Sequence, residues 1–330
     1  MSIKLSILDP SPIVSEHSAA EALSRTRELA LAADEMDYRS FWVQEHHNTE
    51  SFAGTAPEIM MADLASRTKR LQLGSGGIML PNYSPLKVAE ISTTLSALYP
   101  GRIEIGLGRA TGADPRASAA LLGPGADNFP QMLRMLLDWV LDASDEVPLP
   151  PDHRARGISS RPKAAKPDIW VLCSSPSSAA FIGAMGLKLA FADFLNPGLA
   201  SAALSAYREA FTPSLFAQRP YAAIGLTALT AKSKTQAETL ASTMLAWSAA
   251  RARGAGGPFL PVAQARHQLD QTPATTIRAG IIGEANDVAD KLRQLAEDSG
   301  ADELFILSVT ETLQDRITSY RLLNEAWCQG

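Results

Sequence analysis

The stretch that decides the fold runs from residue 71 to residue 108 and reads LQLGSGGIMLPNYSPLKVAEISTTLSALYPGRIEIGLG. Leu71–Ser75 is a short apolar run that ends in glycines, as buried strands often do. Lys87–Leu98 carries its apolar residues at helical spacing. Ile103–Leu107 is strand-like again. A strand, a helix and a second strand in this order predict a parallel sheet whose strands are joined by crossover helices.

The same alternation extends over the whole chain. Eight runs have strand character, namely Lys4–Leu8, Ser40–Gln44, Leu71–Ser75, Ile103–Leu107, Asp168–Cys173, Leu189–Phe194, Tyr221–Leu229 and Glu303–Val309. Between them lie helical segments, of which 129–140 is the clearest amphipathic helix. Parallel sheets need cover on both faces, and eight repeats in about 300 residues favour closure. We predict an α/β fold, a (β/α)₈ TIM barrel, as one domain spanning residues 1–330.

The alternative of an open nucleotide-binding sheet is disfavoured by the glycine pattern. Gly106, Gly108 and Gly112 give GxGxxxG. The dinucleotide fingerprint GxGxxG needs glycine at position 111, where Thr111 stands.

Two stretches interrupt the alternation. Val147–Pro167 is rich in proline with basic residues between, which predicts an irregular surface insertion in the barrel. Arg251–Thr276 holds several glycines and prolines, which predicts a long loop. On a barrel, such a loop is a candidate lid over the active site.

Composition narrows the class of protein. The chain has 330 residues, of which 46% are hydrophobic, and a formal net charge of −5. This composition excludes a disordered chain. The net charge also lacks the basic excess that is typical of nucleic-acid-binding proteins. No apolar stretch reaches the length of a membrane span, and the first residues do not resemble a signal peptide. Two cysteines, Cys173 and Cys328, cannot form a disulfide framework. We predict a cytoplasmic enzyme with a small-molecule substrate and no nucleic-acid or membrane partner.

The active site of a barrel lies at the carboxyl ends of its strands. The fifth strand runs into Ser174 and Ser175, and Pro176 then starts a helix. Such a helix start presents free N–H groups that suit a phosphate. Arg109 follows the neighbouring strand and could bind the same phosphate. The alternatives are that the serines only cap the helix and that Arg109 forms an ion pair, for example with Glu104.

A glycine-rich segment, Gly74–Gly77, ends the third strand. Glycine lets the backbone adopt unusual angles and lets a flat ligand approach closely. A simple tight turn would have the same composition. The segment is therefore a candidate ligand contact at the same end of the barrel.

The second strand ends in Glu45, His46 and His47. Successive side chains on a strand point to opposite faces, so one histidine enters the site while the strand geometry lasts. One neutral imidazole is a candidate general acid or base, and a structural histidine is the alternative. The histidines lack the spacing of metal ligands, so no metal site is expected.

Taken together, these strand ends resemble the bacterial-luciferase-like flavin monooxygenases. The likeness is carried by FWVQEHHN at 41–48, GSGGIMLPN at 74–82, PL at 85–86, AE at 89–90, PGRIEIGLGRA at 100–110, Ser174-Ser175 and GADEL at 300–304. It covers most of the chain and is densest over 38–122 and 168–197. The chain is most similar to the single-chain subgroup, which includes oxygenases of aromatic polyketide tailoring.

The resemblance implies a role for each matching residue. His46 matches the catalytic histidine of the family. Gly76 and Gly77 match the site of a non-prolyl cis peptide beneath the flavin ring, so we expect a cis bond between them. Met79 belongs to the same cofactor-binding segment. The phosphate-binding positions of the family match Arg109, Ser174 and Ser175.

The resemblance also implies cofactor, partners and chemistry. The family's barrels are usually dimeric and bind reduced FMN that a separate flavin reductase supplies. O₂ is the co-substrate, and the oxygen is transferred from a flavin C4a-hydroperoxide, which is the cofactor's chemistry. The substrate would be an aldehyde, a ketone or an aromatic polyketide, the last in antibiotic biosynthesis. The alternatives are a deazaflavin-dependent oxidoreductase of the same superfamily and a flavin-binding protein without turnover.

Two departures from luciferase itself stand out. Gly108 occupies the position where luciferase carries a reactive cysteine beside the flavin, so light emission is not expected. The region 123–168 is shorter than in luciferase, so the pocket for a long aldehyde need not be retained.

Overall fold

Eight parallel strands close into a barrel in the computed structural model, which describes residues 3–122, 128–145, 149, 151–153, 157–158, 161–273 and 280–329. In order around the barrel they are β1 (Lys4–Asp9), β2 (Ser40–Val43), β3 (Gln72–Ser75), β5 (Ile103–Gly108), β6 (Asp168–Cys173), β7 (Lys188–Ala192), β8 (Ala222–Ala231) and β10 (Glu303–Leu307). The last strand, β10, pairs with both β8 and β1 and so closes the ring. The predicted (β/α)₈ barrel is confirmed.

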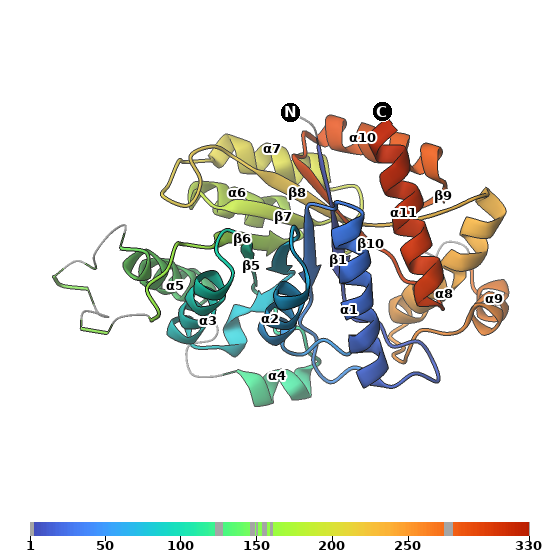
Figure 1. Ribbon diagram of the computed structural model, residues 1–330, viewed down its shortest axis with the longest axis horizontal. Coiled ribbons are helices and arrows are strands. Elements are labelled where there is room, and N and C mark those ends of the chain that lie inside the picture. Colours follow the sequence, from blue (N-terminus) through green and yellow to red (C-terminus); the bar gives the residue numbers. More distant parts are fainter. Residues whose placement is uncertain are drawn as a thin grey trace.

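Helices surround the barrel (Figure 1). They are α1 (Ala19–Glu35), α2 (Pro57–Arg67), α3 (Pro85–Leu98), α4 (Pro115–Leu121), α5 (Phe129–Ala143), α6 (Pro176–Ala184), α7 (Ala200–Ala210), α8 (Lys234–Ala252), α9 (Val262–Asp270), α10 (Ala285–Ser299) and α11 (Leu313–Gln329). Two short strands and a turn of 3₁₀ helix were not predicted: β4 (Ile78–Met79), β9 (Ile281–Glu284) and η1 (Leu80–Asn82). β4 extends the sheet beside β5, and β9 pairs with the last residues of β8.

The amphipathic pattern of α5 explains how one outer helix is held. Asn128 caps the helix, and its side chain accepts a hydrogen bond from the Gln131 N–H. The apolar stripe predicted from the sequence is the face that the helix buries. Its buried residues include Phe129, Leu133, Leu136, Leu137 and Val140. Burying such a stripe supplies most of the stability of a surface helix.

The amino-terminal end of the barrel is filled by a buried network of charged residues. One guanidinium nitrogen of Arg39 lies 2.8 Å from Glu104 and 3.1 Å from Glu303. The Trp42 indole N–H donates to the other oxygen of Glu104 at 2.7 Å. Above this network the rings of Trp42 and Trp170 meet edge to face, 5.2 Å between centroids. With this end filled, the space for a ligand lies at the carboxyl ends of the strands.

The structure agrees with the prediction for one of the two interrupting stretches and contradicts the prediction for the other. In Val147–Pro167, the described residues form neither helix nor strand, as predicted, and 147–148, 150, 154–156 and 159–160 lie outside the described residues. The prediction of one long loop over Arg251–Thr276 is wrong. Helix α8 runs to Ala252 and α9 begins at Val262, while 274–276 lie outside the described residues. Helix α9 buries only Ala265, so it has no apolar stripe by which the sequence could reveal it.

The segment between α8 and α9 is fixed to the rest of the fold. Phe259 is buried, its N–H donates to Ile13 O at 2.8 Å, and its carbonyl accepts the Ser15 N–H at 2.7 Å. The centre of the predicted lid is therefore packed against the segment after β1 in this structure.

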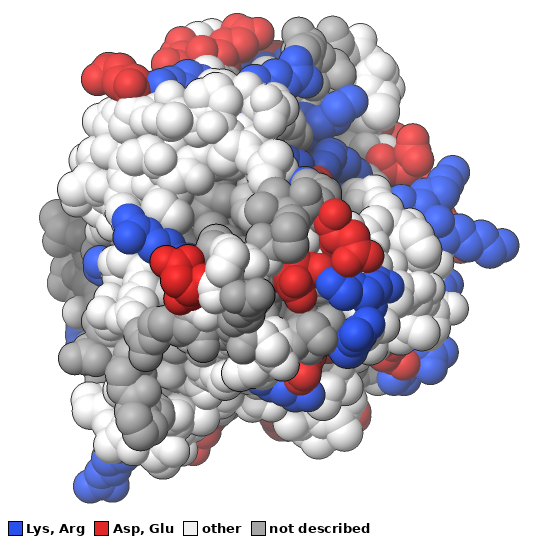
Figure 2. Space-filling model, turned by 90° about the vertical axis from the view of Figure 1, so that its left-hand side faces the viewer, with Lys and Arg blue, Asp and Glu red and all other residues white. Residues whose placement is uncertain are grey.

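The surface carries charges of both signs. On the face shown in Figure 2, lysine and arginine lie among aspartate and glutamate, around a broad area without either. Among the described residues, no helix has the length and apolar character that crossing a membrane requires.

Candidate active site

His46 follows β2 directly and stands at the carboxyl end of the barrel. Its N–H donates to Gly54 O at 2.8 Å, and its ring stacks on Phe52 with centroids 4.5 Å apart. Nε2 lies 3.2 Å from the Gln44 side-chain oxygen, a spacing at which a protonated Nε2 donates to the amide. The backbone contact and the stacked ring together fix the imidazole in one orientation.

The environment of His46 keeps its imidazole neutral. Burial lowers the pKa of His46 to about 4, and electrostatic interactions with His47 and Arg251 act in the same direction. A charged imidazole is disfavoured here because it would lose water without gaining an anionic partner. Near neutral pH, His46 can therefore accept a proton at one nitrogen and donate one from the other.

His47, the next residue, is engaged by a buried carboxylate. Its Nε2 lies 2.8 Å from Oε1 of Glu45, which is fully buried. The other donors to this carboxylate are the Met79 N–H at 2.9 Å, the Asn82 amide at 2.8 Å and the Tyr83 hydroxyl at 3.2 Å. Glu45 thus ties β2 to the segment after β3, and His47 is held in this structural network.

This function of Glu45 was not predicted from the sequence. The residue was recognised only as a neighbour of the histidines, because its partners at 79, 82 and 83 belong to a later part of the chain. The one sequence feature that could have indicated its role is that an acidic residue ends an otherwise apolar, buried strand.

A cis peptide bond joins Gly76 and Gly77, as expected from the resemblance. The Gly76 N–H donates to Val43 O at 2.8 Å. A Cβ added to Gly77 would lie 2.6 Å from Gly106 O, which is backbone of β5. Position 77 therefore requires glycine because of the barrel itself, a reason that is independent of the close approach of a flat ligand.

An apolar pocket opens beside Gly76 at the centre of the barrel mouth. It contains about 300 Å³ of empty space, counting the part open to solvent. Its walls are Leu8, Trp42, Gly76, Leu172, Ala190, Phe191, Ala192, Phe194, Gly225 and Phe305. Apolar walls with a bare backbone on one side suit a flat ring system.

Met79 explains why position 108 has no side chain. A Cβ on Gly108 would lie 2.5 Å from the sulfur of Met79. The backbone N–H of Met79 is held by Glu45, whereas the sulfur belongs to the flexible end of its side chain. A cysteine at position 108, where luciferase has one, would need Met79 to move.

The expected phosphate-binding end lies between β5 and β6, which are neighbours in the barrel. Ser175 caps α6, accepting the Ser178 N–H at 3.3 Å, and Asn196 donates to Ser174 O at 2.9 Å. Arg109 is exposed and makes no hydrogen bond or ion pair within the part of the chain that the structure describes. Its alternative partner, Glu104, is bound by Arg39 instead. Phosphate binding at this end remains a prediction.

The barrel brings the predicted site residues to one end of the molecule. They follow the adjoining strands β2, β3, β5 and β6, and they are His46, Gly76, Gly77, Met79, Arg109, Ser174 and Ser175. Nothing in this arrangement resembles a metal centre: among the described residues, no three His, Cys, Asp or Glu side chains are placed to share an ion.

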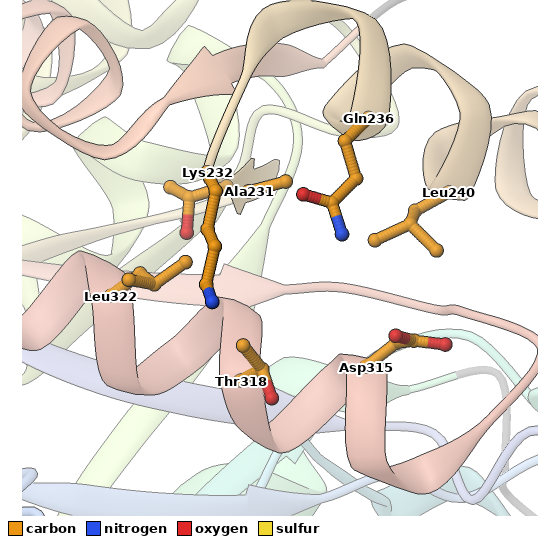
Figure 3. A pocket seen from close by; sticks show the side chains of 8 residues that line it. Ala231, Lys232, Gln236, Leu240, Asp315, Thr318 and Leu322 are labelled. Atoms are coloured by element: carbon orange, nitrogen blue, oxygen red, sulfur yellow. The ribbon is translucent and has the colours of Figure 1, made fainter.

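A second hollow lies apart from this site, on the outer layer of helices (Figure 3). Lys232, Gln236 and Leu240 line it on the side of α8, and Asp315, Thr318 and Leu322 line it from α11. The Lys232 amine points toward α11. The hollow shares no residue with the barrel mouth, so it is not the active site.

Residues 3–303 match the model of one protein family, which is described as luciferase-like monooxygenase. The chain belongs to the luciferase-like monooxygenase family.

Two of the similar proteins match nearly the whole chain, and a third matches part of it. One from Escherichia coli K12 is 35% identical over 331 residues, which are 97% of this chain and 96% of the relative. The crystal structure of apo-MsnO8 is 32% identical, has a TM-score of 0.89 and covers 100% of this chain and 98% of its own. N-acetyl-S-alkylcysteine monooxygenase of Bacillus subtilis is 40% identical over 198 residues, 59% of this chain and 58% of its own length.

More distant solved structures share the fold alone. One is the oxygenating constituent of 3,6-diketocamphane monooxygenase of Pseudomonas putida in complex with FMN, at 18% identity and a TM-score of 0.72, covering 98% of this chain and 97% of its own. Another is an F420-dependent secondary alcohol dehydrogenase, at 16% identity and a TM-score of 0.66, covering 99% of each chain. This fold therefore accommodates both kinds of flavin-like cofactor.

Proposed function

We propose that the chain is a monooxygenase that uses reduced FMN and O₂ to oxidise a small organic substrate. The observation that carries this proposal is the neutral imidazole of His46 at the same barrel end as an apolar pocket. Membership of the luciferase-like monooxygenase family supports the reaction class.

The residues present fit FMN in both of its parts. Ser174, Ser175 and Arg109 would hold the phosphate, because they offer hydroxyls, free N–H groups of a helix start and an uncommitted guanidinium. The ring would lie against Gly76, where the backbone carries no side chain and the opposite walls are apolar. When bound, reduced FMN supplies the electrons with which O₂ is activated.

The chain itself contributes proton transfer, orientation and exclusion of water. His46 is the candidate general acid–base, since it is neutral and its ring is fixed by Phe52. The apolar walls of the pocket, including Leu172 and Phe194, exclude water from the reacting centre.

The proposed substrate class is broad, and it includes the aldehydes, ketones and aromatic polyketides named above. The relative that acts on N-acetyl-S-alkylcysteine adds thioethers to these candidates. A role in antibiotic biosynthesis is part of the proposal for a polyketide substrate only.

The proposal includes two protein partners. A separate flavin reductase would supply the reduced FMN. A second copy of the chain would cover exposed apolar residues on neighbouring outer helices, namely Ile59 on α2, 66% exposed, and Leu98 on α3, 61% exposed.

A titration followed by rapid mixing tests the proposal. The purified chain is titrated with FMN, reduced FMN and the deazaflavin F420, and the complex with reduced FMN is then mixed with O₂ in a stopped-flow spectrometer. We expect tight binding of reduced FMN and a transient absorbance that precedes oxidised FMN. Preference for F420 without reaction with O₂ would instead identify a deazaflavin-dependent oxidoreductase. Binding of FMN with no such transient would identify a carrier.

A further inference from the structure

Two half-buried aromatic rings lie between His46 and an exposed arginine. The ring of Phe52 stacks on His46 and meets Trp247 edge to face, with 5.3 Å between centroids. The guanidinium carbon of Arg251 lies over the Trp247 ring, 6.0 Å from its centroid. These four side chains, which we term the aromatic shelf, form a row from an imidazole to a cation.

The aromatic shelf rests on a buried support. Phe259 stacks beneath Trp247 at 5.0 Å and belongs to a small core with Val14, Met244 and Val309. The Trp247 indole N–H donates to the Ser51 hydroxyl at 3.0 Å, and this hydroxyl donates to Gly257 O at 2.7 Å. The two rings are therefore held in position before any ligand arrives, which lowers the entropic cost of binding.

Arg251 has no acidic partner among the residues that the structure describes. It stands in the last turn of α8, where a cation also interacts favourably with the helix dipole. Its charge nevertheless acts on the active site, because it helps to lower the pKa of His46. The neighbouring Arg253 also has no acidic partner among the described residues, but its guanidinium donates to the Thr272 hydroxyl at 3.3 Å.

The position of Arg251 separates it from the expected phosphate-binding end. Arg251 is joined through the aromatic shelf to the end of β2, whereas Ser174 and Ser175 follow β6, with β3 and β5 between them in the barrel. A cofactor whose phosphate is bound at β6 would therefore not reach Arg251. This arginine, at the other side of the barrel mouth, can bind a different anion.

We infer that Arg251 binds a carboxylate of the substrate, whose apolar part lies on Phe52 and Trp247 with its reacting group beside His46. This inference rests on the proposed function, because it assigns the substrate class of that site. A guanidinium pairs with a carboxylate through two parallel hydrogen bonds, and aromatic rings provide a matching apolar surface. The substrate class is thus an alkyl or aromatic carboxylic acid.

Calorimetric titration with matched probes tests the assignment without turnover. The probes are 3-phenylpropanoate and its neutral amide, 3-phenylpropanamide, added to the FMN-loaded chain at low salt. We expect the unaltered chain to bind the carboxylate at least about tenfold more tightly than the amide. Arg251→Gln should remove this preference and change the amide affinity little. Arg251→Lys should keep part of it, and the control Arg253→Gln should keep all of it.

Three results would overturn the inference. They are the absence of a carboxylate preference in the unaltered chain, an unchanged preference in Arg251→Gln, and weaker FMN binding in Arg251→Gln, which would assign the arginine to the cofactor. The proposed function fails separately, in the reaction of the reduced complex with O₂. A chain that selects carboxylates but gives no transient with O₂ would keep the binding site and lose the monooxygenase assignment.

Discussion

Oε1 of Glu45 lies 2.8 Å from Nε2 of His47, whereas the preceding histidine, His46, stacks on Phe52. Two consecutive histidines thus have different partners: one is held by a buried carboxylate and the other by an aromatic ring. This division makes His46 the reacting candidate and His47 its neighbouring support.

His46→Ala should lower product formation by about 10²–10⁴-fold, the usual contribution of a general acid–base. Affinity for FMN should change little, and O₂ should still be consumed, with H₂O₂ released in place of product. Product and H₂O₂ are both quantified per O₂ consumed. His47→Ala is the matched control and should lose far less activity. If the His46 variant still couples O₂ fully to product, the proton comes from another group.

Glu45→Gln should destabilise the fold by about 1–3 kcal/mol, the cost of leaving buried donors poorly paired. The amide accepts fewer hydrogen bonds than the carboxylate, which holds the Met79 N–H, Asn82, Tyr83 and His47. Denaturant unfolding measures the loss. Glu90→Gln, on a partly exposed side of α3, is the control, and equal stability of the two variants would contradict the structural role of Glu45.

Arg109→Ala should weaken reduced FMN by about 1.5–3 kcal/mol, the value of a charge-assisted hydrogen bond. Riboflavin, which lacks the phosphate, should be affected much less. Fluorescence titration compares the two ligands, and Arg116→Ala tests the effect of removing another exposed arginine. Similar losses for both ligands in Arg109→Ala would exclude this residue from the phosphate site.

Alanine at Gly76 and alanine at Gly77 should impair different properties of the protein. A Cβ at 76 meets Leu8 Cδ1 at 2.5 Å, the end of a movable side chain that lines the pocket, so flavin affinity should fall while the barrel stays stable. A Cβ at 77 meets the backbone of β5, so Gly77→Ala should destabilise the barrel by about 1–3 kcal/mol. Melting temperature and FMN affinity are measured for both variants. Unaltered FMN binding by Gly76→Ala would remove this backbone from the ring site.

The pKa of His46, about 4, predicts how acid affects both activity and stability. The unfolded chain takes up this proton near pH 6.5 and the folded chain only near pH 4, so His46 makes folding less favourable as pH falls through this window. His46→Gln, which cannot take up the proton, should lose less stability between pH 7 and pH 4. The reaction step that depends on neutral His46 should persist to about pH 5. If the unaltered chain and His46→Gln lose stability equally as the pH falls, burial does not lower the pKa of His46.

The fold was predictable because each barrel strand is a short apolar run between helical segments. The exceptions have physical reasons. β4 and β9 are two and four residues long and are fixed by pairing with β5 and β8, which no local pattern encodes. Helix α9 is polar on nearly every side, so the glycines before it dominated the prediction.

The site was predictable only where strand ends determine it. His46 and Gly76–Gly77 follow strands directly, so locating the strands located them. The role of Glu45 depends on donors more than thirty residues away, and Trp247 reaches His46 through Phe52. Such relationships exist only after the chain has folded, and sequence periodicity does not contain them.

The buried network of Arg39, Glu104 and Glu303 has a consequence for the order of events during turnover. Together with the rings of Trp42 and Trp170, this network fills the amino-terminal end of the barrel. In the proposed monooxygenase, cofactor and substrate would both enter at the carboxyl ends of the strands, so the one that binds deeper would enter first and leave last. A reductase that supplied reduced FMN at this end would have to dissociate before the substrate could enter.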